Sequence, residues 1–407
     1  MPDTDGMSDK QQISKRKKIA FVCSGGATKA AAFHMGVGLA LQEKGFRFQG
    51  GLKGKTAPAH APGGMTIDTY VGSSAGSVIA TYLTAGYTVD QIFNAYLGKS
   101  DQSPLKPMTY ASLMSLKASQ HEDASQEGFS KKLRSLTTGA IDLLYRRQKF
   151  LSLSGLFTTA GIESYMREEV LPSNRFQDYH ADLCIVATQL NHSKRVIFSK
   201  HPLPPPKDDP RCLWETRIAI SDTVAASVAL PPIFSPYGIR NHNGKIIYFF
   251  DGEIRETLSV NAAEQMGADL MIASYTHQPY HFSREIGSLT KFGITAIGIQ
   301  AIYLLIERKI QAAIYMRNQK LAALEAVNEY CKKVQLDEKH RKRITAILEQ
   351  KLAVKPDNRY IYINPRPKDH EMFFGDHFNF STKFMEKIVR IGFMSALETL
   401  RRYEFEA

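Results

Sequence analysis

The sequence predicts a three-layer α/β/α protein with a mainly parallel central sheet and an added helical region towards the C-terminus. Apolar runs rich in Val, Ile and Phe alternate along the chain with segments of helical periodicity, as expected when helices connect parallel strands. Glycine-bearing turns follow several of these runs, where a strand gives way to a helix. The predicted strands are residues 19–23, 69–72, 182–188, 195–199, 246–250, 268–274 and 360–364.

Length and composition allow a large core, in one big domain or two. The chain has 407 residues, 43% of them hydrophobic, and a net charge of +12. This charge indicates attraction to an acidic partner, which is a nucleic acid, an anionic membrane surface or an acidic protein. The four cysteines are widely spaced and lack zinc-type spacing. We therefore expect buried free thiols, a cytoplasmic location and no metal.

The first predicted strand ends in a turn that contains Gly25, Gly26 and Ala27, followed by a helix over residues 31–41. Backbone N–H groups in a glycine turn between a strand and a helix favour an anion. The Gly-x4-Gly-Lys-Ser/Thr order of phosphate loops is absent, as is the Gly-x-Gly-x-x-Gly order of dinucleotide sites. The turn therefore predicts an anion-stabilising site and no nucleotide cofactor.

The second predicted strand leads through Gly72-Ser73-Ser74-Ala75-Gly76 into a helix. This Gly-x-Ser-x-Gly pattern is typical of a sharp turn with a serine hydroxyl at its tip, and Gly72 and Gly76 let the backbone pass close on both sides. The helix N-terminus favours negative charge that develops on a tetrahedral intermediate. The pattern predicts Ser74 as a nucleophile, although a flexible turn can have the same sequence.

A third strongly β-type run, residues 246–250, ends in Asp251 and Gly252. Because the carboxyl ends of parallel strands meet at one edge of a sheet, we expect Asp251 to lie near Ser74 and the glycine turn. The three pieces together supply a nucleophile, a base and a cradle for an oxyanion.

These motifs resemble those of the patatin-like phospholipases, serine lipid acyl hydrolases with a Ser-Asp dyad, and the resemblance covers about residues 18–280. The glycine-rich oxyanion motif of the family is similar to residues 25–30, and its nucleophile elbow to residues 72–76. Its Asp-Gly-Gly/Ala motif is similar to Asp251-Gly252-Glu253. Further similar stretches are residues 185–191, 225–234 and 261–269, with a weaker echo at 378–381.

The resemblance implies a patatin-like fold and cleavage of fatty-acyl esters of glycerolipids or phospholipids, without a metal or another cofactor. In the implied mechanism Ser74 attacks the ester and Asp251 acts as the base. The N–H groups of Gly25, Gly26 and Ala27 hold the oxyanion. The implied supporting residues are Gly72, Gly76, Lys29 and Gly252.

An ordinary α/β-hydrolase triad is an alternative for the same serine. In that fold several strands precede the nucleophile, and a histidine follows the acid. Here only one strand and one helix precede Ser74, which favours the dyad. The downstream histidines follow no strand-end pattern: His277, His281, His370 and His377.

Three positions depart from the family pattern: Ala27 and Ala30 replace glycines, and Glu253 replaces a small residue. Alanine restricts the backbone wherever a positive φ is required. A second carboxylate raises the pKa of Asp251 or repels an anionic head group. Two further functions stay open: an acyltransferase that uses the same dyad with an alcohol acceptor, and a catalytically silent lipid- or partner-binding relative.

The composition of the sequence predicts four parts of the chain. Residues 1–18 are a basic tail, predicted to be disordered, with an electrostatic membrane tether as the alternative. Residues 19–280 form the catalytic domain, residues 281–355 a helical region, and residues 356–407 a strand and a helix that pack back on the catalytic domain.

An insertion at residues 100–150 matches the family core poorly. Its stretches 130–134 and 143–150 combine basic and apolar side chains, as in a lid or a segment facing an anionic membrane, or in an ordinary surface helix. Residues 292–306 lack charges but are too few to span a membrane, so we expect a buried or interfacial helix there.

We expect a cytoplasmic protein, peripheral on the inner face of a membrane, without a signal peptide or a transmembrane segment. The chain has no recognisable nucleic-acid-binding motif, so its positive charge predicts membrane contact in preference to nucleic acid. The pattern leaves the oligomeric state open.

Overall fold

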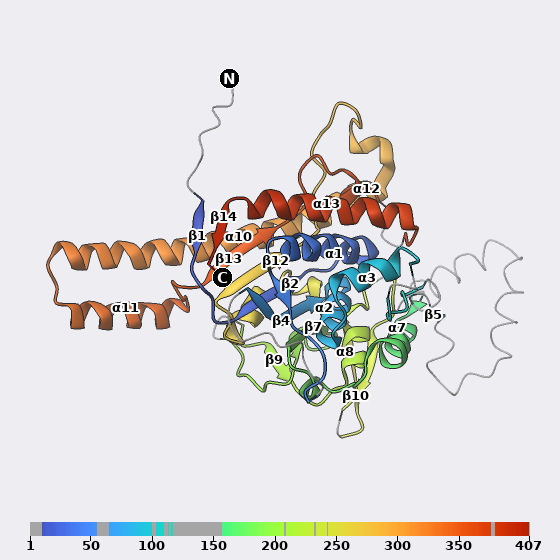
Figure 1. The fold of residues 1–407 in the computed structure, drawn as a ribbon, viewed down its shortest axis with the longest axis horizontal. Coiled ribbons are helices and arrows are strands. Elements are labelled where there is room, and N and C mark those ends of the chain that lie inside the picture. The colour runs from blue at the N-terminus through green and yellow to red at the C-terminus, as the bar shows by residue number, and fades with distance from the viewer. Residues whose placement is uncertain are drawn as a thin grey trace, which may run out of the picture.

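A mixed sheet, ten-stranded within the described part of the chain, forms the centre of the molecule (Figure 1). The computed structural model describes residues 10–54, 65–99, 103–109, 113, 115–116, 157–206, 209–231, 233–241, 243–375 and 379–406. The main path across the sheet is β10-β11-β7-β4-β2-β12-β13, and β3, β8 and β9 are attached to it.

Parallel pairing dominates the middle of this sheet and confirms the predicted class. The parallel strands are β7 (Asp182–Gln189), β4 (Thr66–Ser73), β2 (Ile19–Cys23), β12 (Leu270–Ser274) and β13 (Arg359–Ile363). The strands with antiparallel partners are β8 (Lys194–Phe198), β10 (Tyr237–Arg240) and β11 (Ile246–Asp251). Two short strands extend the sheet in parallel, β3 (Arg47–Phe48) on β4 and β9 (Cys212–Glu215) on β8.

Both faces of the sheet pack against a hydrophobic core. This explains why its strands are continuous apolar runs and do not alternate between apolar and polar residues. In β2, Ile19 and Phe21 belong to one hydrophobic cluster, whereas Ala20 and Val22 belong to another. Successive side chains of a strand point to opposite faces, so the two clusters are the cores of the two faces. The cysteines are free and buried.

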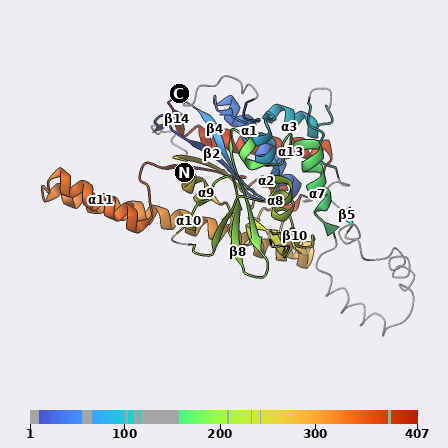
Figure 2. The same cartoon turned by 90° about the horizontal axis from the view of Figure 1, so that it is seen from below.

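Helices lie over both cores and give the molecule its three layers (Figure 2). The first core is covered by α1 (Ala27–Glu43), α2 (Ala75–Ala85), α3 (Val89–Tyr96), α7 (Ala160–Tyr165), α8 (Ile220–Ser227) and α13 (Thr382–Leu400). The second is covered by α9 (Val260–Gln265) and by part of α10 (Gly293–Lys333).

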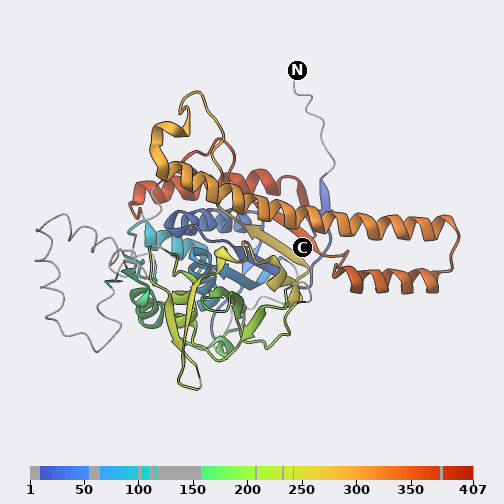
Figure 3. The ribbon, with the colours of Figure 1, turned by 180° about the vertical axis from the view of Figure 1, so that it is seen from behind.

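The long helix α10 crosses the molecule and, with α11 (Glu338–Leu352), extends beyond it as a helical arm (Figure 3). Residues 292–306, predicted as a buried or interfacial helix, lie at its start. The prediction of burial is wrong for much of this stretch, because Ile294 is 86% exposed and Leu305 is 67% exposed. In the described part of the chain no helix combines the length and the hydropathy needed to cross a membrane.

Two helices that cover the first core are short. Strand β6 (Phe157–Thr158) precedes α7, and the backbone of Phe157 pairs with Ile233 and Phe234. Helix α8 has eight residues. The basic stretches at 130–134 and 143–150 lie outside the described residues. The remaining short elements are β5 (Ser115–Leu116), η4 (Met166–Val170), η5 (Phe176–Asp178), η6 (Gly252–Ile254), η7 (Leu289–Phe292) and α12 (Glu371–Phe374).

The N-terminal tail is ordered where it is described, which corrects the expected disorder for residues 10–18. Strand β1 (Gln11–Ile13) pairs in parallel with β14 (Tyr403–Phe405), and Ile13 is buried. The N–H groups of Lys17 and Lys18 donate to the carboxylate of Asp269. A buried side chain and these backbone partners outweigh the polar composition that predicted disorder. Residues 1–9 lie outside the described chain.

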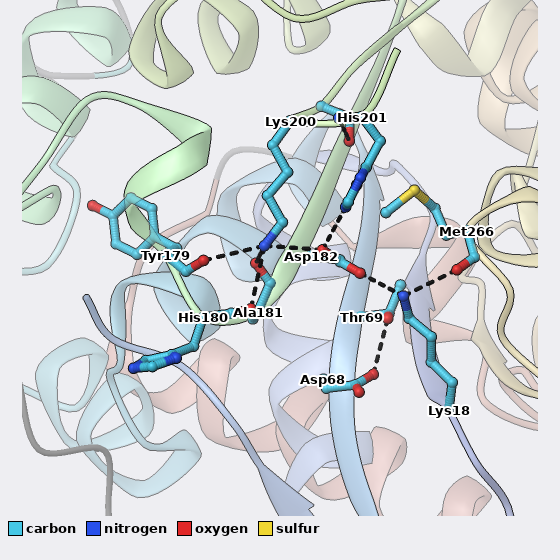
Figure 4. A network of polar contacts seen from close by, with 11 residues as sticks. Lys18, Asp68, Thr69, Tyr179, His180, Ala181, Asp182, Lys200, His201 and Met266 are labelled. Atoms are coloured by element: carbon cyan, nitrogen blue, oxygen red, sulfur yellow. Dashed lines mark hydrogen bonds and ion pairs between the residues drawn. The ribbon is translucent and has the colours of Figure 1, made fainter. Parts of the chain in front are cut away.

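A charged network closes the amino-terminal edge of the parallel strands (Figure 4). Lys18 contacts Asp182 at 2.5 Å, and Lys200 and His201 each contact the same carboxylate at 2.9 Å. Burial alone raises the pKa of Asp182, but the hydrogen bonds from these three side chains outweigh it and lower the pKa to about 2. The network therefore stabilises the edge of the sheet opposite the carboxyl ends of its parallel strands.

We predict that Asp182→Asn lowers the free energy of unfolding at neutral pH by roughly 1–2 kcal/mol, allowing for solvent screening of a partly exposed group. A depressed pKa contributes stability above the unfolded value of 3.8, and this contribution is lost as the pH falls towards 2. Urea denaturation at several pH values measures the difference between parent and variant. Asp90→Asn on the surface of α3 is the control. A difference that did not shrink at low pH would contradict the assignment.

Candidate active site

Ser74 lies between β4 and α2 in a strained backbone conformation, with φ 52° and ψ −127°. The turn requires glycine on both sides. A Cβ on Gly72 would lie 2.4 Å from the carbonyl oxygen of Gly76, and one on Gly76 would lie 2.2 Å from that of Cys23. The hydroxyl of Ser227 accepts a hydrogen bond from the Ser74 N–H at 2.9 Å. The structure therefore forms a sharp turn here, with Ser74 between the end of β4 and the start of α2.

Asp251, at the end of β11, is a buried carboxyl group beside Ser74. It accepts a hydrogen bond from the Glu253 N–H at 2.9 Å, and it lies close enough to the Ser74 hydroxyl for that group to lower its pKa. Burial raises the pKa of Asp251 to about 6, although the Ser74 hydroxyl and the Glu253 N–H both act to lower it. A carboxylate with this pKa can take a proton from a hydroxyl near neutral pH.

The two side chains meet through a topology that differs from the predicted one. Asp251 does not end a parallel strand, because β11 runs antiparallel to β7. In register, Ser73 pairs with Val186 and Asp251 pairs with the next residue of β7, Ala187. Since β8 occupies the other edge of β7 over these residues, β4 and β11 share one edge and meet end to end.

The glycine turn after β2 lies against the nucleophile. A Cβ on Gly25 would lie 2.8 Å from the Ser74 Cβ and 3.4 Å from its Oγ, so the Gly25 backbone is in direct contact with Ser74. The Thr276 hydroxyl donates a 2.8 Å hydrogen bond to the Gly25 carbonyl oxygen. Gly26 has φ 131° and Ala27 has φ 57°, so two consecutive residues adopt positive φ.

Sequence reasoning missed His34, which holds this turn from behind. Its Nδ1 lies 2.7 Å from the Ser274 hydroxyl, and its Nε2 lies 2.9 Å from the Ser24 carbonyl oxygen. Burial lowers the pKa of His34 to about 4, against the opposing effect of the Ser24 hydrogen bond, so the ring is neutral. A lone histidine in an apolar helix carries no pattern that reveals this contact.

Lys29 is fully buried in the first turn of α1. Its Nζ donates a 2.7 Å hydrogen bond to the Met372 carbonyl oxygen and lies 5.6 Å from the centre of the Tyr303 ring. These contacts connect the helix that follows the glycine turn with α10 and with the segment around α12.

Gly252 and Glu253 follow Asp251 in η6. A Cβ on Gly252 would lie 2.4 Å from the Val186 carbonyl oxygen. The Glu253 side chain is buried and packs against Gly25. A Cβ added to Gly25 would lie 2.8 Å from the Glu253 Cγ. Burial and then the Asp251 charge raise the pKa of Glu253 well above its usual range. The sequence predicted a second carboxylate near Asp251, but not its contact with the glycine turn.

An open pocket adjoins Ser74. Its walls are almost entirely apolar, and they include Val78, Ile162, Leu230, Phe234, Phe380 and Met385. Ligand pockets commonly have an apolar lining of this kind, with a few polar groups that fix orientation. Ser74 and Thr28 contribute hydroxyl groups to the wall. The cavity therefore suits an acyl chain whose ester group lies at Ser74. Among the described residues, no cluster of three or more His, Cys, Asp or Glu side chains could hold a metal ion.

Comparison with protein-family models matches residues 21–264, more than half of the chain, to the patatin-like phospholipases. The chain belongs to this family. A comparison with curated proteins gave no match. Patatin-like phospholipases are lipid acyl hydrolases with an α/β fold, so the predicted resemblance is confirmed at the level of family, fold and lipid substrate.

The patatin-like match contains Ser74, Asp251 and the glycine turn, but the structure adds support from beyond residue 264. Thr276 and Ser274, which hold the turn, follow the matched region, as does Met372, which accepts from Lys29. The site of this patatin-like protein therefore depends on a longer part of the chain than the family match.

Ala27 occupies a backbone conformation that favours glycine, so we predict that Ala27→Gly raises the free energy of unfolding by about 0.5–1 kcal/mol. Ala30→Gly is the matched control in the same helix. It should lower stability by about 1 kcal/mol, because Ala30 lies inside α1 and is buried. Urea denaturation measures both. Equal destabilisation by both variants would show that the positive φ at residue 27 carries no strain.

Proposed function

We propose that this protein hydrolyses fatty-acyl esters of glycerolipids or phospholipids through an acyl-Ser74 intermediate, with Asp251 as the base. The observation that carries the proposal is the proximity of the Ser74 hydroxyl to the buried Asp251 carboxyl group, whose pKa it lowers, at the wall of an apolar cavity. A nucleophilic hydroxyl beside a buried base is the arrangement that covalent acyl transfer requires.

In the proposed reaction Asp251 takes the Ser74 proton while the Ser74 Oγ forms a bond to the ester carbonyl carbon. The N–H groups of Gly25, Gly26 and Ala27 stabilise the negative oxygen. The tetrahedral intermediate collapses, the ester C–O bond breaks, and the leaving alkoxide takes the proton from Asp251. Water then repeats the sequence on the acyl-enzyme, releasing the fatty acid and restoring the Ser74 hydroxyl.

The strained elbow supports this assignment of the nucleophile. Its φ of 52° places Ser74 at the start of α2, whose N-terminus favours negative charge. The Gly25 backbone in contact with Ser74 supports an oxyanion site formed by the same turn.

Contact with an anionic membrane is part of the proposal, because the substrate is a lipid and the chain has a net charge of +12. An acyltransferase would use the same dyad with an alcohol in place of water. Analysis of the products formed with and without a lysolipid acceptor separates the two activities.

A catalytically silent lipid-binding protein is a second candidate that one specific observation favours. The buried Glu253 carboxyl group lies close to the Gly25 N–H and the Ser73 hydroxyl, yet both of its oxygens lack a hydrogen-bond partner of good geometry among the described residues. If ionised, it would oppose a negative charge that develops beside Gly25. If neutral, it leaves the oxyanion site usable.

We predict that a fluorophosphonate probe labels the parent protein and that Ser74→Ala abolishes labelling. Asp251→Asn keeps the shape of the carboxyl group but cannot accept a proton, so both variants should lose about a thousandfold or more in phospholipid hydrolysis. Ser199→Ala, at a buried serine after β8, is the matched control. Labelling that persists in Ser74→Ala would remove the proposed nucleophile, and an unlabelled parent that still binds vesicles would favour the silent candidate.

We further predict a bell-shaped dependence of kcat/KM on pH. Activity rises through a pH of about 6 as Asp251 ionises, and falls at higher pH as Glu253 ionises beside Gly25. The variant Glu253→Gln keeps the neutral shape, so it should retain the acidic limb and lose the alkaline fall.

The charged side chains that follow Glu253 pair with other residues: Arg255 pairs with Asp209, and Glu256 pairs with Arg195. On α10, Lys309 donates to the Ile254 carbonyl oxygen.

The pH profile of hydrolysis of a soluble short-chain ester measures this effect without a lipid surface. An alkaline fall that persists unchanged in Glu253→Gln would exclude Glu253 as its cause. Loss of the acidic limb in that variant would show that Asp251 is not the base that titrates there.

A further inference from the structure

The start of α10 is mostly apolar and has no charged side chain on any side, although only one side packs against the protein. Residues 292–306 carry no charge. Ala296, Tyr303 and Ile310 are buried and form the inner stripe of the helix. Helices that are hydrophobic all round are normally enclosed, so an exposed apolar side indicates a further contact.

The opposite side of these turns is exposed to solvent. Ile294 is 86% exposed, Leu305 67%, Ile302 56% and Ile297 47%, and these positions follow the helical spacing of a single face. Phe292, just before the helix, is 46% exposed, and Phe282 in the preceding loop is 72% exposed. We call the exposed side chains of these six residues the α10 apolar face.

This face lies at the end of the molecule that contains the cavity. Tyr303, on the inner side of the same turns, packs on Phe373 and faces Lys29 in the first turn of α1, where Ala27 and Thr28 line the cavity. Figures 1 and 3 show the start of α10 at the same end as α3 and α7, whereas the arm extends from the other end. Tyr96 of α3 and Ile162 of α7 also line the cavity.

Basic side chains flank the apolar stretch. Lys291 precedes it, Arg308 and Lys309 follow it, and Arg284 lies in the loop beside Phe282. These residues are exposed, and over residues 281–309 they outnumber the acidic residues Glu285 and Glu307. Apolar and aromatic side chains between basic residues match an anionic lipid surface, where apolar groups enter the boundary and cations meet head groups.

We propose that the α10 apolar face lies on the surface of an anionic phospholipid bilayer and brings the cavity end of the molecule to its lipid. The inference rests on the proposed function, because a lipid substrate in a bilayer gives this face its partner. A second copy of the chain is the competing occupant, since two such faces can also cover each other.

The test compares the parent with the triple variant Ile297→Gln, Ile302→Gln and Leu305→Gln. All three side chains are exposed, so the fold should be retained. Flotation with vesicles of phosphatidylcholine and phosphatidylglycerol measures binding. We expect the triple variant to bind at least about tenfold more weakly, because three apolar side chains no longer leave water. Binding of the parent should weaken in vesicles of phosphatidylcholine alone and at high salt.

The matched control replaces exposed apolar side chains farther along the same helix: Tyr315→Gln, Met316→Gln and Tyr330→Gln. This variant should bind vesicles like the parent. An equal loss in the control, or unchanged binding by the triple variant, would overturn the proposal. The proposal would also be overturned if sedimentation showed that the parent is a dimer and the triple variant a monomer.

Hydrolysis of a soluble short-chain ester separates this inference from the proposed function. The triple variant should hydrolyse it like the parent, because the α10 apolar face does not include Ser74 or Asp251. If Ser74→Ala retains that activity while vesicle binding still depends on the α10 apolar face, the catalytic assignment fails and the docking surface stands.

Discussion

The edge that β4 and β11 share on β7 is the constraint on which the candidate site depends. Ser73 and Asp251 pair with consecutive residues of β7, so the end of one strand meets the end of the other. A one-residue slip would turn every side chain of the slipped strand to the other face. Register is strongly specified here because both faces of the sheet are buried, and the precision of the Ser74–Asp251 contact therefore derives from the core rather than from the site itself.

Burying two carboxyl groups side by side is costly, and the local structure offsets part of the cost. Asp251 accepts a hydrogen bond from the Glu253 N–H and lies beside the Ser74 hydroxyl. Glu253 lacks well-placed partners among the described residues, and burial and the Asp251 charge favour its neutral form. The pair divides the roles that a single carboxyl group cannot combine: one member is ionised near neutral pH and the other retains its proton. This division explains how Glu253 can lie against Gly25 without a negative charge beside the proposed oxyanion site.

The motifs of the site were predictable from sequence because each depends on local chemistry. Gly72 and Gly76 are required by close backbone contacts within one turn, and the apolar strand before Ser74 predicted the edge of the sheet at which Ser74 lies. The antiparallel direction of β11 was not predictable, because strand direction depends on pairing with β7 and leaves no mark in the strand's own residues. The same reason applies to His34 and Thr276, whose contacts join segments about 240–250 residues apart in the chain.

The glycine turn shows why the family match and the functional unit have different boundaries. Its carbonyl groups are held by Thr276 and by His34, which in turn contacts Ser274 of β12. The following helix is held by Lys29, whose partner Met372 lies more than 300 residues later. A strained turn persists only when its surroundings over-determine it. Here β12 and the C-terminal segments supply those surroundings, so the chain after residue 264 is part of the apparatus that keeps Gly25 against Ser74.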